Sequence, residues 1–141
     1  MADYFTSFSL ILKLPGETAQ KYALDLANQA RAIMDLGDTP PADFPASLME
    51  AVEDWQFETV AENSPEIRGI WLQSRNGGLD AVCAFIQHLL QHFSIKKKVA
   101  FEWSHDCSKP RIDAYGGGAA IITADKIKTM NTGQWLHQHA A

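Results

Sequence analysis

FSLILKLPG, residues 8–16, decides how this chain begins to fold. Its apolar residues take every second position, namely Phe8, Leu10, Leu12 and Leu14. This period of two is typical of a strand with one apolar face, and Pro15-Gly16 is expected to end it. From Glu17 to about Leu36 the apolar residues instead recur every three or four positions, which predicts an amphipathic helix. Gly37 stands where a glycine commonly closes a helix.

The two periods alternate along the rest of the chain. Strands are predicted where β-branched and aromatic residues gather, over 57–61, 67–73, 99–104 and 119–123. A second long helix is predicted from Asp80 to Phe93, and shorter helices over 46–55 and from Thr123 or Asp125 to Met130. The polar segment from His105 to Tyr115 is predicted to be a loop.

These elements predict an α+β fold. Two main helices on one face of a mostly antiparallel sheet of about five strands make a two-layer sandwich. The order of the elements favours the split βαβ arrangement of ferredoxin-like folds. The 141 residues are expected to form a single domain, 1–141, in which 124–141 makes a short C-terminal helix and tail. The uncovered face of the sheet would meet water or a partner.

Composition and charge limit the classes of function. The chain is 46% hydrophobic and 21% charged, which is typical of a soluble globular protein. It shows neither a membrane-spanning apolar run nor a signal-peptide pattern, so no membrane partner is expected. Two cysteines without a CxxC motif fit the reduced cytoplasm. The net charge of −5 disfavours nucleic acid as a partner, although residues 94–141 carry a balance of +3 against −8 for residues 1–93.

The densest cluster of reactive side chains lies within residues 102–111. It offers His105 as a base and Cys107 as a nucleophile, with Ser104 and Ser108 as alternative nucleophiles. Neighbours on a strand point to opposite faces, so a strand that continued through His105 would place its side chain on the opposite face from the Asp106 carboxylate. His105 and Cys107 are therefore weak catalytic candidates, and a polar connection between strands is the alternative interpretation.

The residues after Cys107 suggest a ligand site of a different kind. Lys109 and Arg111 flank a proline in a stiff cationic corner suited to a carboxylate or phosphate. Gly116, Gly117 and Gly118 do not match a phosphate loop, because a strand rather than a helix is predicted to follow them. Glycines at a strand entry do allow the backbone to approach a ligand or another strand closely. Ligand binding by these five residues is thus a hypothesis beside that of a solvated loop.

No metal ion and no other cofactor is expected. His88 and His92 stand four residues apart on the second predicted helix, a spacing that can place two imidazoles on one metal ion. The sequence offers no third ligand beside them, and both lie on the flank of the apolar stripe of that helix. They are therefore predicted to be partly exposed histidines of the helix surface.

Trp71 is the candidate interface residue. It is out of phase with Ile70 and Leu72 in its predicted strand, so it is expected on the uncovered face of the sheet. Large aromatic side chains commonly anchor interfaces between proteins.

The C-terminal third of the chain also carries a resemblance. It rests on FEW at residues 101–103, CSKPR at 107–111, GGGA at 116–119 and TAD at 123–125, with Asn131-Thr132 and Trp135 beyond. In these residues the chain resembles a loose group of small uncharacterised bacterial proteins, many of them from phages or mobile elements. The resemblance implies a bacterial cytosolic setting and an accessory role in a mobile element, and it supplies no activity.

The sequence therefore predicts a small acidic cytoplasmic protein that binds a protein partner or its own copy and catalyses no reaction. Two alternatives stay open. One is a small enzyme or anionic-ligand binder centred on His105–Arg111, which an activated Cys107 thiol would support. The other is nucleic-acid binding through the basic C-terminal third, which would show a steep dependence on salt.

Overall fold

The alternating stretch at the start of the chain forms β1 (Tyr4–Lys13), and the amphipathic stretch after it forms α1 (Glu17–Leu36). Gly37 ends α1 in the left-handed conformation, with a φ of 68°, which a residue without a Cβ adopts at little cost. The predicted strand and helix are both confirmed in this computed structural model, which describes residues 2–140.

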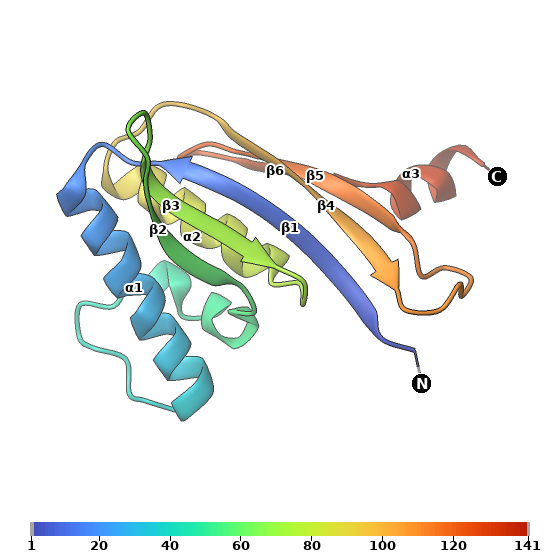
Figure 1. Cartoon of the computed structure of the whole chain (residues 1–141), viewed down its shortest axis with the longest axis horizontal. Helices are drawn as coiled ribbons and strands as arrows, with labels where there is room; N and C mark the ends of the chain where they lie inside the picture. The colour runs from blue at the N-terminus through green and yellow to red at the C-terminus, as the bar shows by residue number, and fades with distance from the viewer. Residues whose placement is uncertain (1, 141) are drawn as a thin grey trace.

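The remaining elements follow in the order expected for an α+β chain (Figure 1). They are β2 (Glu58–Asn63), β3 (Arg68–Ser74), α2 (Leu79–His92), β4 (Val99–Cys107), β5 (Gly116–Ile122), β6 (Ile127–Asn131) and α3 (Thr132–His139). The described strands form one six-stranded sheet in the order β2-β3-β1-β4-β5-β6, and every neighbouring pair is antiparallel. The first strand of the chain therefore lies in the middle of the sheet.

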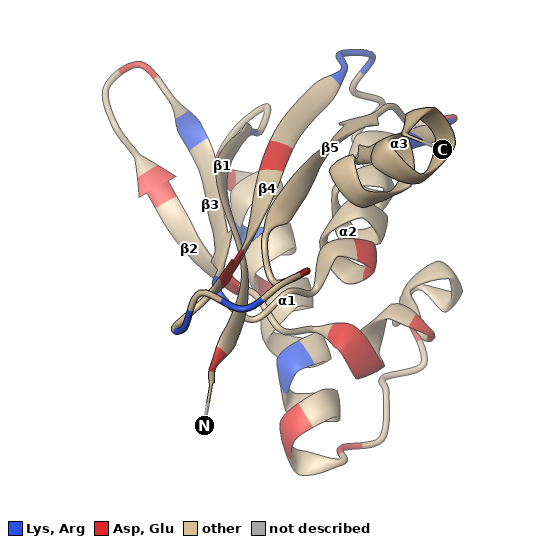
Figure 2. Ribbon diagram, turned by 90° about the vertical axis from the view of Figure 1, so that its right-hand side faces the viewer, with Lys and Arg blue, Asp and Glu red and all other residues tan. Residues whose placement is uncertain are grey.

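The helices α1 and α2 lie on one side of this sheet, as Figure 2 shows. The side chains on that face of the central strands are buried, namely Phe8 and Leu12 of β1, Ile70 and Leu72 of β3, Phe101 of β4, and Ala120 and Ile122 of β5. They form one core with Leu26 of α1 and with Phe85 and Leu89 of α2. Burying each large apolar side chain contributes roughly 1.5–3 kcal/mol, so this layer carries most of the favourable free energy of folding.

The C-terminal part of the sheet differs from the sequence prediction. Residues 127–131 form β6 where a short helix was expected, and the helix follows later as α3. Pairing with the edge of β5 supplies the backbone hydrogen bonds of this segment, and such tertiary pairing outweighs a weak local preference. The expected count of about five strands is thereby raised to six among the described residues.

Two other boundaries were also predicted wrongly. Residues 46–55 form two short 3-10 turns, Ala46–Leu48 and Ala51–Asp54, in place of one short helix. β4 continues through His105 to Cys107, where a loop was expected, because its end pairs with the first residues of β1. Gly116, Gly117 and Gly118 accordingly lie inside β5 and pair with residues 103–105 of β4.

Candidate functional site

The face of the sheet away from α1 and α2, here called the open face, carries a line of apolar side chains. Ile11 of β1 pairs with Trp71 of β3, which pairs in turn with Val60 of β2. These side chains are 47%, 37% and 44% exposed, whereas the strand neighbours on the other face are buried in β3 and buried or partly buried in β1. Ile121 of β5 and Met130 of β6, 44% and 47% exposed, extend the apolar surface beyond β4. Large side chains gathered in this way mark a surface that can bind another molecule.

Trp71 is held in one position on the open face. Its indole Nε1–H donates a hydrogen bond of 2.7 Å to the Ser9 hydroxyl on the neighbouring strand. Because the only polar atom of the indole already has a partner in the protein, covering the ring costs no hydrogen bond to water. The predicted place of Trp71 on the uncovered face is confirmed, and its role in an interface stays a prediction.

Charged side chains flank the apolar line, with opposite signs at the two edges of the sheet. On β2, the strand at one edge, the side chains of Glu58 and Glu62 lie on the open face, as that of Val60 does. On β6, the strand at the other edge, Lys128 lies on the open face together with Met130, and Lys126 directly precedes that strand. In Figure 2 the acidic residues of β2 are visible in red at its edge of the sheet. The two edges of the open face thus carry opposite charges, while Lys13 of β1 and Glu102 and Asp106 of β4 lie on the same face between them.

Sequence reasoning did not find most of this surface. Ile11 and Val60 each stand alone among polar residues at the exposed positions of a strand, and Ile121 follows only small residues at those positions; one large apolar residue there carries little information. Their alignment follows from the strand order, which brings the consecutive strands β2 and β3 beside β1, a strand from a distant part of the chain. The sequence signal that could have revealed this surface is the recurrence of such isolated apolar residues in several predicted strands.

The catalytic candidates at the end of β4 do not form a catalytic pair. His105 Nδ1 is engaged at 2.9 Å with the Thr6 hydroxyl on β1, and Cys107 is buried at its pairing position opposite Tyr4. Within residues 2–140, no hydrogen bond joins His105 to Cys107. Since β4 continues through both residues, the side chain of Asp106 is placed on the opposite face from theirs.

Lys109 and Arg111 lie exposed in the loop between β4 and β5. The loop is fastened at one end, where Ser108 exchanges two hydrogen bonds with Asp3. At the other end the Tyr115 hydroxyl donates to the carbonyl oxygen of Lys109 at 3.3 Å. These contacts hold the loop against the N-terminal end of β1, and they leave both cations in solvent.

The three glycines have a packing explanation. A Cβ on Gly117 would collide with the carbonyl oxygen of Trp103, and a Cβ on Gly118 would collide with the indole ring of Trp103 and the carbonyl oxygen of Met130. Gly116 has a φ of 140°, a conformation that side chains disfavour, and lies against the hydroxyl of Thr132. Close approach between β5 and its neighbours accounts for all three positions, while ligand binding there stays a prediction.

A second polar group lies between α1 and α2. The hydroxyl of Tyr22 and Nε2 of His88 share a hydrogen bond of 2.8 Å, and the Tyr22 ring stacks on that of His92 with centroids 4.1 Å apart. Burial, and next the nearby His92, lowers the pKa of His88. Burial, and next Asp43, raises the pKa of Tyr22. The predicted surface histidines are therefore parts of a helix-to-helix contact, with His88 half-buried and His92 exposed.

Neither cysteine has the surroundings of an activated thiol nucleophile. Both cysteines are free and buried. Burial, and next the nearby Asp80, raises the pKa of the Cys83 thiol to about 11, so this residue is protonated and unreactive at neutral pH. Nor do residues 2–140 contain a group of three or more histidine, cysteine or acidic side chains placed to hold a metal ion.

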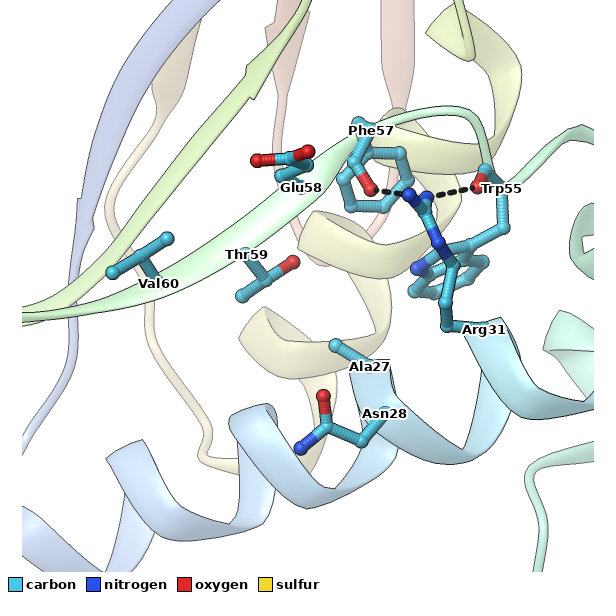
Figure 3. Close-up of a pocket in the computed structure, with 8 residues that line it drawn as sticks. All are labelled: Ala27, Asn28, Arg31, Trp55, Phe57, Glu58, Thr59 and Val60. Carbon is cyan, nitrogen blue, oxygen red and sulfur yellow. Dashed lines mark hydrogen bonds between the residues drawn. The ribbon is translucent and has the colours of Figure 1, made fainter. Parts of the chain in front are cut away.

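A hollow of about 220 Å³ lies between α1 and the edge strand β2 (Figure 3). Arg31 fills one end, where its Nη1 donates to the carbonyl oxygens of Trp55 and Phe57 at 3.0 and 3.1 Å. Asp35 lies 3.3 Å from the Arg31 Nε and balances its charge. Arg31 is therefore already committed to holding the segment before β2 against α1, which is a structural role that sequence reasoning did not identify.

Comparisons with protein-family models, with curated proteins and with solved structures found no match. None of the helices in the described part of the chain has the length and apolar character needed to cross a membrane.

Proposed function

We propose that this protein is a non-enzymatic interaction module that binds a protein partner through the open face of its sheet. The observation that carries the proposal is the apolar line Val60–Trp71–Ile11, which crosses three adjacent strands and continues at Ile121. A row of exposed apolar side chains on a regular sheet presents a rigid surface, so binding would order few side chains and cost little conformational entropy.

The architecture supports a binding role. We propose that β1, α1, β2, β3, α2 and β4, with the strand order β2-β3-β1-β4, make a ferredoxin-like core. The pair β5–β6 would then widen that core sheet by two strands and extend its open face. Placing both main helices on the other side leaves this wide surface accessible.

The two alternative functions have weaker support. The loop alternative needs an accessible nucleophile beside a base, whereas Cys107 is buried and His105 is engaged with Thr6. Nucleic-acid binding through the basic C-terminal third is disfavoured by carboxylates of that same third on the open face of β4, Glu102 and Asp106, which would repel phosphates. We keep the cytoplasmic location as a proposal that rests on the two cysteines and on the resemblance. The accessory role in a bacterial mobile element is a proposal that rests on the resemblance alone.

Photo-crosslinking in cells tests whether the open face contacts a protein. The photoreactive amino acid benzoylphenylalanine would replace Val60 in one version of the chain and Ile121 in another. A third version carries it at Lys97, an exposed residue between α2 and β4, as the control. We expect adducts of defined mass from the two open-face positions, none from position 97, and loss of the adducts when Trp71→Asp is added.

Circular dichroism of the purified Trp71→Asp variant would verify that the fold is retained. Absence of adducts from both open-face positions, or equal adducts from position 97, would overturn the proposed function.

A further inference from the structure

We infer that the occupant of the open face is a second copy of this chain, packed face to face with the twofold axis parallel to the strands. This inference rests on the proposed function and specifies its partner. The evidence is the distribution of charge and side-chain size across the six strands of the sheet.

The first argument is the charge asymmetry of the open face. Glu58 and Glu62 lie on β2 at one edge, and Lys126 and Lys128 lie on or beside β6 at the other edge. A surface with one sign at each edge complements an identical surface only if the edges are exchanged between the two copies.

Two symmetric ways of stacking identical sheets differ in whether the edges are exchanged between the two copies. A twofold axis across the strands would place β2 over β2 and β6 over β6, so that like charges meet at both edges. An axis parallel to the strands, running between β1 and β4, places β2 of each copy over β6 of the other. Only the second arrangement brings the edge with Glu58 and Glu62 over the edge of the other copy with Lys126 and Lys128, and it does so twice.

Trp71 and Ile11 fit the same arrangement, in which Val60 comes to lie over Lys128 of the other copy. The β1–β4 pairing ends at Ser7–Ser104, and the same register continued further would place Ile11 level with Ala100, which pairs with Ile121. A twofold axis parallel to the strands leaves the position of each residue along the strands unchanged. β3 therefore lies over β5, and Trp71 meets Ile121 of the other copy. Ile11 then lies over Ala100, and this pairing of a large with a small side chain fills the space between two sheets about 10 Å apart.

The area is close to that of a stable dimer interface. Six strands spaced by about 4.8 Å and about 25 Å long give an open face of roughly 600 Å² in projection. The accessible area of such a corrugated surface is larger, and stable interfaces bury about 800 Å² on each partner. Association through a smaller part of the face would leave Trp71 or Ile121 uncovered.

Charge exchange between the two edges tests this arrangement. We would measure self-association by sedimentation equilibrium for the wild type, for Glu58→Lys with Glu62→Lys, for Lys126→Glu with Lys128→Glu, and for all four substitutions together. The matched control is Lys96→Glu with Lys97→Glu, which makes the same charge change in the α2–β4 connection. We expect a wild-type dimer, a dissociation constant raised about tenfold or more by either pair, and recovery to near the wild-type value in the fourfold variant.

Each other outcome has a definite meaning. A wild type that stays monomeric at all concentrations overturns the inference, and adducts to a different protein in the crosslinking experiment would then still support the proposed function. The wild type could dimerise while the fourfold variant dimerises no more tightly than either double variant, or while the control variant weakens the dimer equally. Either result would overturn the proposed direction of the axis and with it the inference. Circular dichroism of each variant would separate weakened association from loss of the fold.

Discussion

The indole nitrogen of Trp71 and the hydroxyl of Ser9 are joined by a hydrogen bond of 2.7 Å across the β1–β3 pair. The contact fixes the largest side chain of the open face against its own sheet, so that the ring is already placed before a partner arrives. Preorganisation of this kind improves affinity by reducing the entropy that association must lose.

Replacing Ser9 with alanine should therefore weaken association through the open face. The indole would lose its partner and its fixed position, and a hydrogen bond of this kind contributes about 1 kcal/mol, or about fivefold in the dissociation constant. Sedimentation equilibrium would measure the change, with Ser7→Ala as the control in the same phase of β1. An unchanged dissociation constant for Ser9→Ala would show that the hydrogen bond plays no part in association.

Thr59 should tolerate, and even benefit from, loss of its hydroxyl. Its Oγ1 is buried beside the Arg31 hollow and has no hydrogen-bond partner among the described residues (Figure 3). Thr59→Val keeps the shape and removes the unsatisfied group, so we expect the free energy of unfolding to rise by about 1 kcal/mol. Urea denaturation would measure it, and Thr59→Ser, which keeps the hydroxyl and loses the methyl, should destabilise. A less stable Thr59→Val variant would mean that the hydroxyl has a partner such as water.

Gly118→Ala should destabilise the sheet. The new methyl group would collide with the Trp103 indole and with the carbonyl oxygen of Met130, so β5 would have to move away from one neighbour. Overpacking of this kind costs about 1–3 kcal/mol, which thermal denaturation would detect. Gly133→Ala, in α3, is the control, because there the nearest atom, Asn131 Oδ1, is at a relaxed 3.6 Å. Equal melting temperatures for the two variants would contradict the packing explanation of the glycines.

Acidification should destabilise the protein through His88. Burial and the neighbouring His92 lower the pKa of His88 below its ordinary value of 6.5. The unfolded chain therefore binds the proton more readily, and the free energy of unfolding should fall as the pH drops below about 6.5.

Urea denaturation at pH 7.5 and pH 5 would measure this dependence in the wild type and in His88→Gln, whose amide can still meet the Tyr22 hydroxyl. We expect a smaller loss of stability in His88→Gln, and no change from the wild-type dependence in the control His137→Gln, an exposed position of α3. The same loss in all three proteins would exclude His88 as the cause.

The fold could be predicted from the sequence where burial imposes a period. β1 and α1 have clear periods because each has one buried face, and Trp71 could be placed on the uncovered face for the same reason. β6 could not be predicted, because all five of its residues are exposed and the segment forms a strand only by pairing with β5. Likewise, the open-face line depends on strand order, which is decided by pairings between residues about 60 to 100 positions apart.

The central position of β1 has a consequence for synthesis of the chain on the ribosome. This strand emerges before the other strands of the sheet, yet its pairing positions lie on β3 and on β4, whose last residue, Cys107, pairs with Tyr4. At about 5–20 residues per second, some 100 residues take about 5–20 s to translate. Both edges of this apolar strand are unpaired until β3 is complete at Ser74, and the edge that pairs with β4 stays exposed to other nascent chains throughout that interval. Chaperones that capture short hydrophobic segments are thus expected to act on residues 4–14 before the sheet can close around them.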